Sequence, residues 1–501
     1  MKKFNHHELV RHKLTELSNQ TRRQFLRHSA GLSGAMLLSQ LANINKASAS
    51  SYHLDFTRDS RTPLSPLPPQ FTPRAKRVIY LHMAGGPSQL ELFDHKPILT
   101  KYDGKDCPQS YLEGKKFAFL TGVPKLMGSL YPFKQYGESG AWMSDRLPNL
   151  TKHVDDICFI KSMHTDQFNH APAQILMQTG SNQLGHAALG AWTTYGLGTE
   201  NQNLPGFIVL NSGGSDPSGG KNLWNSGYLP SVYQGVQCRS EGEPVLYLNN
   251  PEGVSRKSRR NVLDLLNVIN KDDYKNFNDP ENLTRTAQYE MAYRMQLEAT
   301  NAFNVHQEPE EMHTRYGTTK GKGSFANNCL VARRLIERGV RFVQLFDTGW
   351  DMHGTNNSTS LNIGFKNKCQ QIDQPIAALL SDLKASGLLE DTLLVFTSEF
   401  GRTPMKENRG NKVSDFAGRD HCPQSFTSWI AGGGVKGGYS HGETDELGYE
   451  VVKDPVSVQD FHATLLYLLG FDHHALTYPY QGLEQRLTGV KHSRVISQIL
   501  A

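Results

Sequence analysis

The stretch Asp391-Thr-Leu-Leu-Val-Phe-Thr-Ser-Glu399-Phe-Gly-Arg402-Thr-Pro404 decides the fold class that the sequence predicts. Its residues 393–396 form a short, continuous apolar run, which is typical of a strand buried on both faces of a parallel sheet. A glycine and a proline then end the strand. Glu399 is therefore expected at the carboxyl end of a buried strand, which is where open α/β sheets place their ligands.

A second polar segment, Gly418-Arg-Asp420-His421, follows after a polar loop. We interpret Glu399 and His421 as members of one metal or catalytic cluster. The alternative interpretation is that Glu399 pairs with Arg402 and that His421 caps a loop.

Helices and strands alternate regularly before this stretch. Residues 325–337 form an amphipathic pattern that ends at Gly339 and leads into a strand over 340–346. A second amphipathic pattern covers 372–386, directly before the stretch quoted above. Such alternation predicts βαβ crossovers and a mostly parallel sheet in an α/β protein. The charged range 250–315 is predicted to be a helical insertion.

A second cluster of polar side chains follows the predicted strand over 340–346, in Asp347-Thr-Gly-Trp-Asp351-Met-His353. Carboxylates and a histidine at a strand end are candidate ligands for zinc, manganese or calcium. The alternative is that Asp351 or His353 caps the following helix.

A third cluster lies between a predicted strand over 157–163 and a predicted helix over 173–178, which Gly180 ends. The loop between them presents His164, Asp166, Asn169 and His170. Because backbone N–H groups at a helix N-terminus attract anions, this loop is also a candidate anion-binding site.

The first 49 residues are predicted to be an export signal. Arg22-Arg23 precede a weakly apolar segment and the small residues Ala47-Ser-Ala49, in the order of a twin-arginine signal. A periplasmic or otherwise extracytoplasmic protein is therefore expected. Residues 50–75 are predicted to be an extended lead-in and 76–501 the folded domain. No later stretch reaches the roughly 18 apolar residues of a membrane-spanning helix.

The signal also explains the basic composition. It carries eight Lys/Arg and two Asp/Glu, a net charge of +6, whereas the whole chain has +5, so the remaining residues carry −1. This balance gives no support for a nucleic-acid partner. Six scattered cysteines without a CxxC pair indicate neither a zinc ribbon nor a disulfide-dense scaffold. The chain also lacks a dinucleotide-binding fingerprint.

Together these motifs resemble the alkaline phosphatase/sulfatase superfamily, and most closely an exported, sulfatase-like family within it that is catalogued as a domain of unknown function, number 1501. The resemblance extends from about Lys76 to Leu500. The segments that carry it are Leu81-His-Met-Ala-Gly-Gly-Pro-Ser88, Asn169-His170 with Thr179-Gly180, residues 325–346, Trp350-Asp-Met-His353, Thr397-Ser-Glu-Phe-Gly-Arg-Thr-Pro404, Gly418-Arg-Asp-His421 and residues 460–470.

The resemblance implies a large, mostly parallel sheet sandwiched by helices, with divalent metals at the strand ends that activate a nucleophile. Transferred residue by residue, it makes Asp351, His353, Glu399 and His421 metal ligands. His170, next to Asn169, falls in the position of the nucleophile, so these two are the candidate catalytic residues. Because that position holds no Ser, Thr or Cys, a formylglycine sulfatase mechanism is not expected. Histidine there can act as a phosphoryl acceptor or as a base for water. The alternatives are that it is a metal ligand or a relic without a catalytic role.

Two further departures from the family pattern concern the metal ligands. Residues 83–86 lack the acidic ligand expected after the first strand, and Glu91 or Asp94 is its candidate substitute. Phe400 stands where phosphatases carry a histidine.

The predicted function is that of an exported, metal-dependent hydrolase of phosphate or sulfate esters, acting on a small-molecule, glycan or lipid substrate. The alternative is a non-catalytic binding or assembly protein that retains the fold.

Overall fold

The computed structural model describes residues 62–115, 117–245, 248–277, 279, 281–409 and 415–501. The predicted signal at 1–49 and the first part of the predicted lead-in lie outside the described residues.

The described chain is built on a nine-stranded sheet with the order β12-β4-β11-β8-β1-β7-β5-β6, and β15 also pairs with β4. Its strands are β1 (Arg77–Met83), β4 (Ile157–His164), β5 (Phe207–Ser212), β6 (Val236–Cys238), β7 (Phe342–Asp347), β8 (Thr392–Thr397), β11 (Phe426–Ala431), β12 (Tyr439–His441) and β15 (Val456–Ser457). The pairs from β8 through β1, β7 and β5 to β6 are parallel, whereas β11 is antiparallel to both β8 and β4. The predicted α/β class with a mostly parallel sheet is confirmed.

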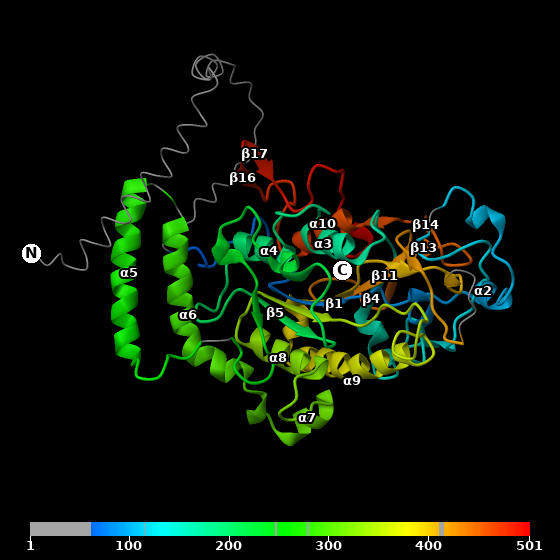
Figure 1. The fold of residues 1–501 in the computed structure, drawn as a ribbon, viewed down its shortest axis with the longest axis horizontal. Coiled ribbons are helices and arrows are strands. Elements are labelled where there is room, and N and C mark those ends of the chain that lie inside the picture. The colour runs from blue at the N-terminus through cyan, green and yellow to red at the C-terminus, as the bar shows by residue number, and fades with distance from the viewer. Residues whose placement is uncertain (1–61, 116, 246–247, 278, 280, 410–414) are drawn as a thin grey trace, which may run out of the picture. The chain divides into compact units, whose positions relative to one another are not determined.

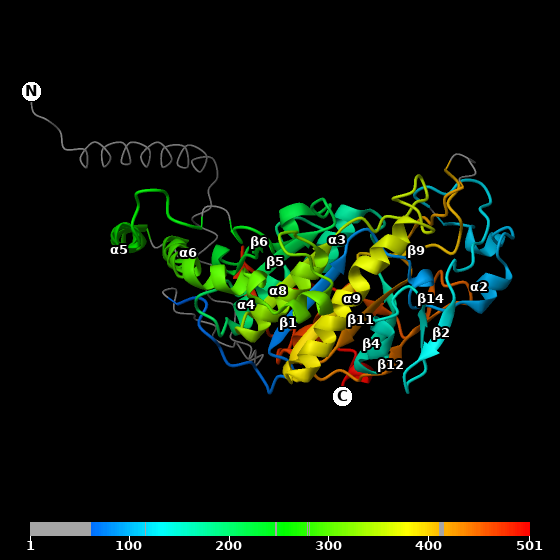
Figure 2. The ribbon, with the colours of Figure 1, turned by 90° about the horizontal axis from the view of Figure 1, so that it is seen from below.

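Helices cover both faces of the sheet (Figure 1). On one face lie α3 (His170–Thr179), α4 (Leu189–Leu197) and α10 (Val458–Leu468), and on the other lie α8 (Phe325–Glu337) and α9 (Gly364–Ala385). Figure 2 shows α9 crossing the sheet on that second face. The pattern at 325–337 predicted α8 correctly. Helix α9 begins at Gly364, before the predicted start at residue 372, and its first turns bury Phe365 and Cys369.

The range 250–315 contains the long helices α5 (Arg256–Phe277) and α6 (Glu281–Phe303) and the short helix α7 (Glu310–Tyr316). In Figure 1, α5 and α6 stand side by side at one end of the sheet, with α6 nearer to it. At the opposite end lie α2 (Pro97–Lys101) and small two-stranded ribbons, among them β13 (Glu443–Thr444) with β14 (Val451–Lys453).

All six cysteines are buried and unpaired. Among the described residues, none of the helices combines the length and the apolar character that a membrane crossing requires.

The sheet topology brings the three predicted polar clusters to one edge of the sheet, at the carboxyl ends of its parallel strands. Strands β1, β4, β7 and β8 run in the same direction, so the segments that follow them lie at the same edge. Because β11 runs the opposite way, the segment that precedes it lies at that edge too. His170 follows β4, Asp351 follows β7, Glu399 follows β8 and His421 precedes β11.

Two glycines allow the loops at this edge to approach one another. Gly85 has φ +122°, and a Cβ atom there would lie 2.6 Å from the backbone nitrogen of Asp351. At Gly418, a Cβ atom would lie 2.0 Å from the carbonyl carbon of His353. Only glycine permits both approaches, because any side chain would collide with backbone atoms.

A buried ion pair fixes the segment that precedes His421. The guanidinium of Arg419 lies 2.7 Å from the carboxylate of Glu91, and both side chains have no exposed surface. Arg419 also donates to the backbone carbonyls of Thr403 and Gly128. The pair therefore joins the turn after β1 to the loop that carries His421.

Replacing Glu91 by glutamine should lower the free energy of unfolding by about 3 kcal/mol, because Arg419 would remain buried with its charge uncompensated. Urea unfolding measures the change. The matched control is Glu450→Gln, which removes the exposed ion pair with Lys115 and should cost less than about 1 kcal/mol. Equal losses in the two variants would contradict this role.

Candidate metal centre

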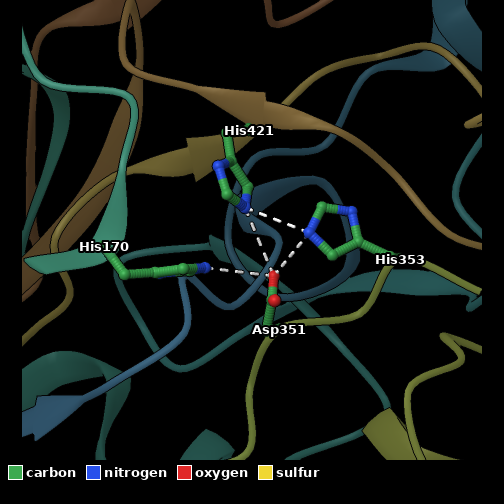
Figure 3. Close-up of side chains that lie close together, drawn as sticks. All are labelled: His170, Asp351, His353 and His421. Carbon is green, nitrogen blue, oxygen red and sulfur yellow. Dashed lines mark hydrogen bonds and ion pairs between the residues drawn. The ribbon is translucent and has the colours of Figure 1, made fainter. Parts of the chain in front are cut away.

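Four side chains converge on one point at this edge of the sheet (Figure 3). The Oδ1 atom of Asp351 lies 2.9 Å from Nε2 of His353 and 3.3 Å from Nε2 of both His170 and His421. The Nε2 atoms of His353 and His421 are 3.1 Å apart. Three imidazole nitrogens and one carboxylate oxygen thus face each other.

The Nδ1 atom of each imidazole, which points away from Asp351, makes a hydrogen bond that fixes the ring. Nδ1 of His170 lies 2.7 Å from Oε1 of Glu399, and Nδ1 of His353 is hydrogen-bonded to Oε2 of Glu407. Nδ1 of His421 lies 2.7 Å from the backbone carbonyl oxygen of Phe168. Metal-binding histidines are typically oriented by a carboxylate or a carbonyl at the nitrogen that does not bind the metal.

The contact with Phe168 determines the tautomer of His421. A carbonyl oxygen only accepts, so Nδ1 of His421 carries the proton. Burial, together with the positive charge of Arg402, lowers the pKa of His421 to about 4. The ring is therefore neutral at pH 7, and its Nε2 lone pair faces the oxygen of Asp351. Two electron-rich atoms at this distance repel each other unless a cation lies between them.

Without a bound ion, both ring nitrogens of His170 are protonated at pH 7, and the side chain is a cation. Burial lowers its pKa, but the nearby carboxylates of Asp351 and Glu399 outweigh burial and raise the pKa to about 9. Its Nε2 atom is buried and makes no well-aligned hydrogen bond within the described part of the chain. A metal ion would supply the positive charge and the partner that this nitrogen lacks.

The spacing of the donor atoms fits a tetrahedral ion. Ligands held at about 2.0–2.1 Å from zinc in a tetrahedron are separated by roughly 3.3 Å. The four separations given above lie between 2.9 and 3.3 Å. The residues present therefore fit a single divalent ion, and three of the four predicted metal ligands, Asp351, His353 and His421, lie in this group.

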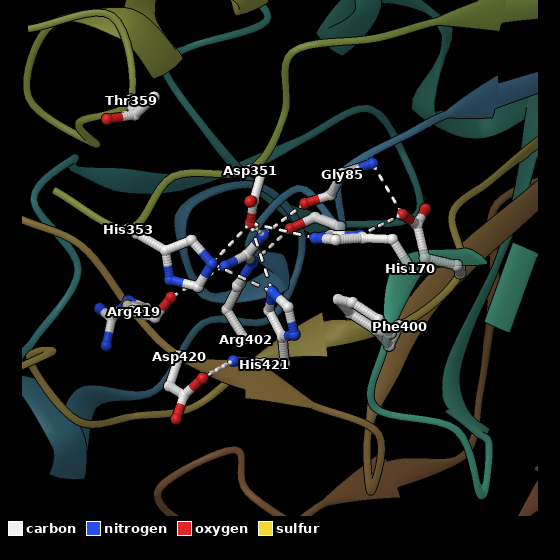
Figure 4. Close-up of polar contacts among 12 residues, drawn as sticks. Gly85, His170, Asp351, His353, Thr359, Phe400, Arg402, Arg419, Asp420 and His421 are labelled. Carbon is white, nitrogen blue, oxygen red and sulfur yellow. Dashed lines mark hydrogen bonds and ion pairs between the residues drawn. The ribbon is translucent and has the colours of Figure 1, made fainter. Parts of the chain in front are cut away.

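Arg402 contacts the same carboxylate oxygen of Asp351 as the three histidines (Figure 4). Its Nη2 atom lies 2.5 Å from Oδ1 of Asp351, and the guanidinium also donates to the carbonyls of Gly85, Gly86 and Arg419. Burial raises the pKa of Asp351, but Arg402 and the three histidines outweigh it and hold the carboxyl well below its usual range. The pairing of Arg402 with Glu399, considered from the sequence, does not occur.

The structure places Glu399 behind His170, outside the four converging side chains. Its buried carboxylate accepts from Gly85 N at 2.8 Å and Gln174 Nε2 at 3.0 Å, and it contacts His82 and His170. Burial raises the pKa of Glu399, but the hydrogen bonds with His170 and His82 outweigh it and keep the carboxyl ionised. Glu399 thus orients His170.

The other residues considered from the sequence lie elsewhere. Asn169 is exposed, directly before α3, and makes no cap hydrogen bond through its side chain. The predicted substitutes Glu91 and Asp94 are bound to Arg419 and to Lys96 and Thr444, respectively. Helix capping by Asp351 or His353 is also excluded, because α9 begins only at Gly364.

Phe400 takes the position where a further histidine was considered. Its ring centroid lies 4.9 Å from that of His170 and 4.4 Å from that of His421. The apolar ring packs against both imidazoles, whose own centroids are 4.5 Å apart, and restrains them without offering a further donor.

A pocket of about 140 Å³ opens beside the group. The turn after β1, the Thr348–Gly349 turn and the loop 215–218 line it, together with Gln174, His170 and Asp351. The side chain of Asp351 is 42% exposed, whereas those of His353 and His421 are 7% and 4% exposed. A small ligand therefore reaches the group from the side of Asp351 and His170.

A family model described as "Protein of unknown function (DUF1501)" matches residues 75–500. The chain belongs to the DUF1501 family. This result confirms the family that the sequence motifs resemble.

Individual proteins resemble this DUF1501 chain more distantly. Arylsulfatase K of Danio rerio is 31% identical over 102 residues, which cover 20% of this chain and 17% of that protein. A protein of the alkaline phosphatase superfamily from Vibrio parahaemolyticus has 12% identity over 85% of this chain and 75% of its own, with a TM-score of 0.31. The sulfatase PsFucS1 from Pseudoalteromonas sp. has 13% identity over 79% and 68%, with a TM-score of 0.33.

The Glu399→Gln variant should bind zinc about 10- to 100-fold more weakly than the wild type, because an amide orients His170 less strongly and makes it a poorer donor. Competition with a zinc chelator measures the affinity. Glu390→Gln, at an exposed residue before β8, is the matched control and should bind zinc like the wild type. Equal affinity in the Glu399 variant would show that this carboxylate does not support the site.

Zinc affinity of the DUF1501 protein should rise with pH up to about pH 9. The pKa of His170 is about 9 without an ion, so below that pH an incoming ion must displace one proton from the ring. The affinity should increase by up to tenfold per pH unit. Chelator-buffered titrations from pH 6 to pH 9 test this expectation, and a flat profile would contradict it.

Proposed function

We propose that this protein is a metal-dependent hydrolase of phosphate or sulfate esters. The observation that carries the proposal is the convergence of three oriented imidazoles on the Asp351 carboxylate, beside a pocket that leads to them. His170, Asp351, His353 and His421 would hold the ion.

The donor set favours zinc among the metals considered from the sequence. Three imidazole nitrogens suit zinc, whereas calcium takes six to eight oxygen ligands. The short separations between the donor atoms also suit a small, four-coordinate ion.

A bound divalent ion would act as a Lewis acid on an ester oxygen and lower the pKa of water. The titratable side chains that line the pocket are His170, Asp216 and Asp351. Because two of them are carboxylates, an anionic ester gains little attraction from the pocket without the ion. Substrate binding should therefore require metal.

Water is the nucleophile that this arrangement favours. Nδ1 of His170 is bonded to Glu399, and its Nε2 would bind the ion, so neither nitrogen would be free to accept a phosphoryl group. In this proposal His170 is a metal ligand and forms no covalent intermediate. A phosphoryl or sulfuryl group at the mouth would occupy the pocket between the turn after β1 and the loop 215–218.

One feature favours a second candidate, a non-catalytic binding or assembly protein. Structural zinc sites are closed by four protein ligands, whereas catalytic sites keep one position open. The present group offers four donors. Catalysis would therefore require either that the exposed Asp351 leaves the ion, which would open one coordination position, or that the ion accepts a fifth ligand. An Asp351 that stayed bound would make the ion structural.

The proposal includes export. The twin-arginine pattern of residues 21–27 and the small residues at 47–49 support an extracytoplasmic location. Esters of small molecules, glycans or lipids are the substrate classes that we consider there.

The protein purified without chelators should contain one equivalent of zinc or a similar ion, measured by elemental analysis. His421→Ala should lose the ion and any hydrolysis of a panel of phosphate and sulfate esters. His306→Ala, at a half-exposed histidine paired with Glu241, is the matched control and should keep both.

Each outcome discriminates between the two candidates. An ion that is lost in His421→Ala, with no hydrolysis of any ester by the wild type, would favour the binding protein. A folded wild-type protein without any ion would overturn the metal centre itself.

A further inference from the structure

Several polar side chains of helix α5 contact the neighbouring helix α6. The guanidinium of Arg260 forms a two-pronged ion pair with Glu290 of α6, at 2.5 and 2.8 Å. Asn267 and Asn270 donate to Glu290 and Thr286 of α6. On this side of α5, Leu263 is the buried apolar residue.

The opposite side of α5 is apolar and exposed. Val262, Leu265, Val268 and Ile269 are 57%, 55%, 65% and 44% exposed. Their spacing of three, four and seven residues places them on one stripe of the helix. Amphipathic helices at a protein surface normally bury the apolar stripe and expose the polar one. In α5 the two faces are exchanged.

We propose that the apolar stripe of α5, defined by Val262, Leu265, Val268 and Ile269, is a dimerisation surface on which a second copy of this chain packs α5 antiparallel to its own. The proposal does not depend on the metal centre. In Figure 1, α5 lies at one end of the described fold with α6 between it and the sheet, and the side chains of the stripe are exposed.

The charges of α5 favour an antiparallel second copy. Arg256, Arg259 and Arg260 contact residues of the same chain, whereas Lys257 near the N-terminus of α5 and Asp272 near its C-terminus are exposed. A twofold axis near Leu265 places Lys257 of each helix beside Asp272 and Asp273 of the other. It also places each helix N-terminus near the C-terminus of its partner, which is favourable for the helix dipoles. The surface is thus complementary to itself, as an isologous contact requires.

The size of the surface predicts a reversible dimer. Helix α5 has 22 residues and is therefore about 33 Å long. A contact along one helix face buries less than the roughly 1,200 Å² of stable complexes. The two α5–α6 pairs together would form four helices in contact, with the aliphatic side chains at their centre.

Sedimentation velocity of the full chain, at about 1 to 200 µM, tests the proposal in the concentration range of weak interfaces. The wild type should change from one chain to two as the concentration rises. Leu265→Glu with Ile269→Glu should remain a single chain throughout and unfold like the wild type, because both positions are exposed. Val452→Glu is the matched control, since Val452 is 64% exposed on β14 at the far end of the molecule. It should dimerise normally.

Disulfide cross-linking tests whether the two α5 helices of the proposed dimer run antiparallel. Because the six native cysteines are buried, a new surface cysteine should be the reactive thiol. Leu265→Cys, near the axis, should form a disulfide between two copies on mild oxidation. Ser258→Cys should not, because antiparallel helices hold the two copies of that position apart. Efficient bonding of Ser258→Cys with itself would overturn the antiparallel arrangement.

A protein that stays monomeric at every concentration would contradict the proposed dimer. If that monomer floated with vesicles of phosphatidylcholine and phosphatidylglycerol, and Leu265→Glu with Ile269→Glu abolished flotation, the stripe would be a membrane-binding surface instead. Dimerisation that persists in Leu265→Glu with Ile269→Glu would place the interface elsewhere.

Discussion

The repulsion between electron-rich atoms around Asp351 is the constraint on which the site depends. The carboxylate oxygen faces three imidazole nitrogens within 3.3 Å, and the neutral His421 directs a lone pair at it. Positive charge must be present for this arrangement to be stable. Arg402 supplies part of it, and the proton of His170 or a metal ion supplies the rest. The surrounding hydrogen bonds keep the imidazoles in place, since each Nδ1 atom has a fixed acceptor.

The sheet explains why these atoms meet. Three of the four donors follow parallel strands, and the fourth precedes β11, which runs in the opposite direction. The loops reach each other because glycine occupies positions 85 and 418, where a side chain would collide with backbone. The fully buried pair of Glu91 and Arg419 then joins two of the loops.

Local patterns in the sequence predicted strands β4, β7 and β8, helices α3, α8 and α9, and most of the polar residues at the edge. A buried strand is recognisable from its apolar run, and helix α8 from its amphipathic spacing, because both depend on neighbours in the chain. The role of Glu399 could not be read in this way. Whether a carboxylate binds an ion or orients a histidine depends on which atom it faces, and that is set by contacts between β8 and α3. Glu407 and Gln174 were missed for the same reason, since their partners are distant in sequence.

The donors of the metal centre come from three segments far apart in the chain: the start of α3, the loop after β7 and the segment before β11. No contiguous part of the polypeptide contains enough of them to hold an ion. An ion that binds only the folded state stabilises the fold in proportion to its concentration and affinity. A chain in which β4, β7 or β11 is mispaired would lose the whole site, so an ion bound there would stabilise only the chain with the completed sheet.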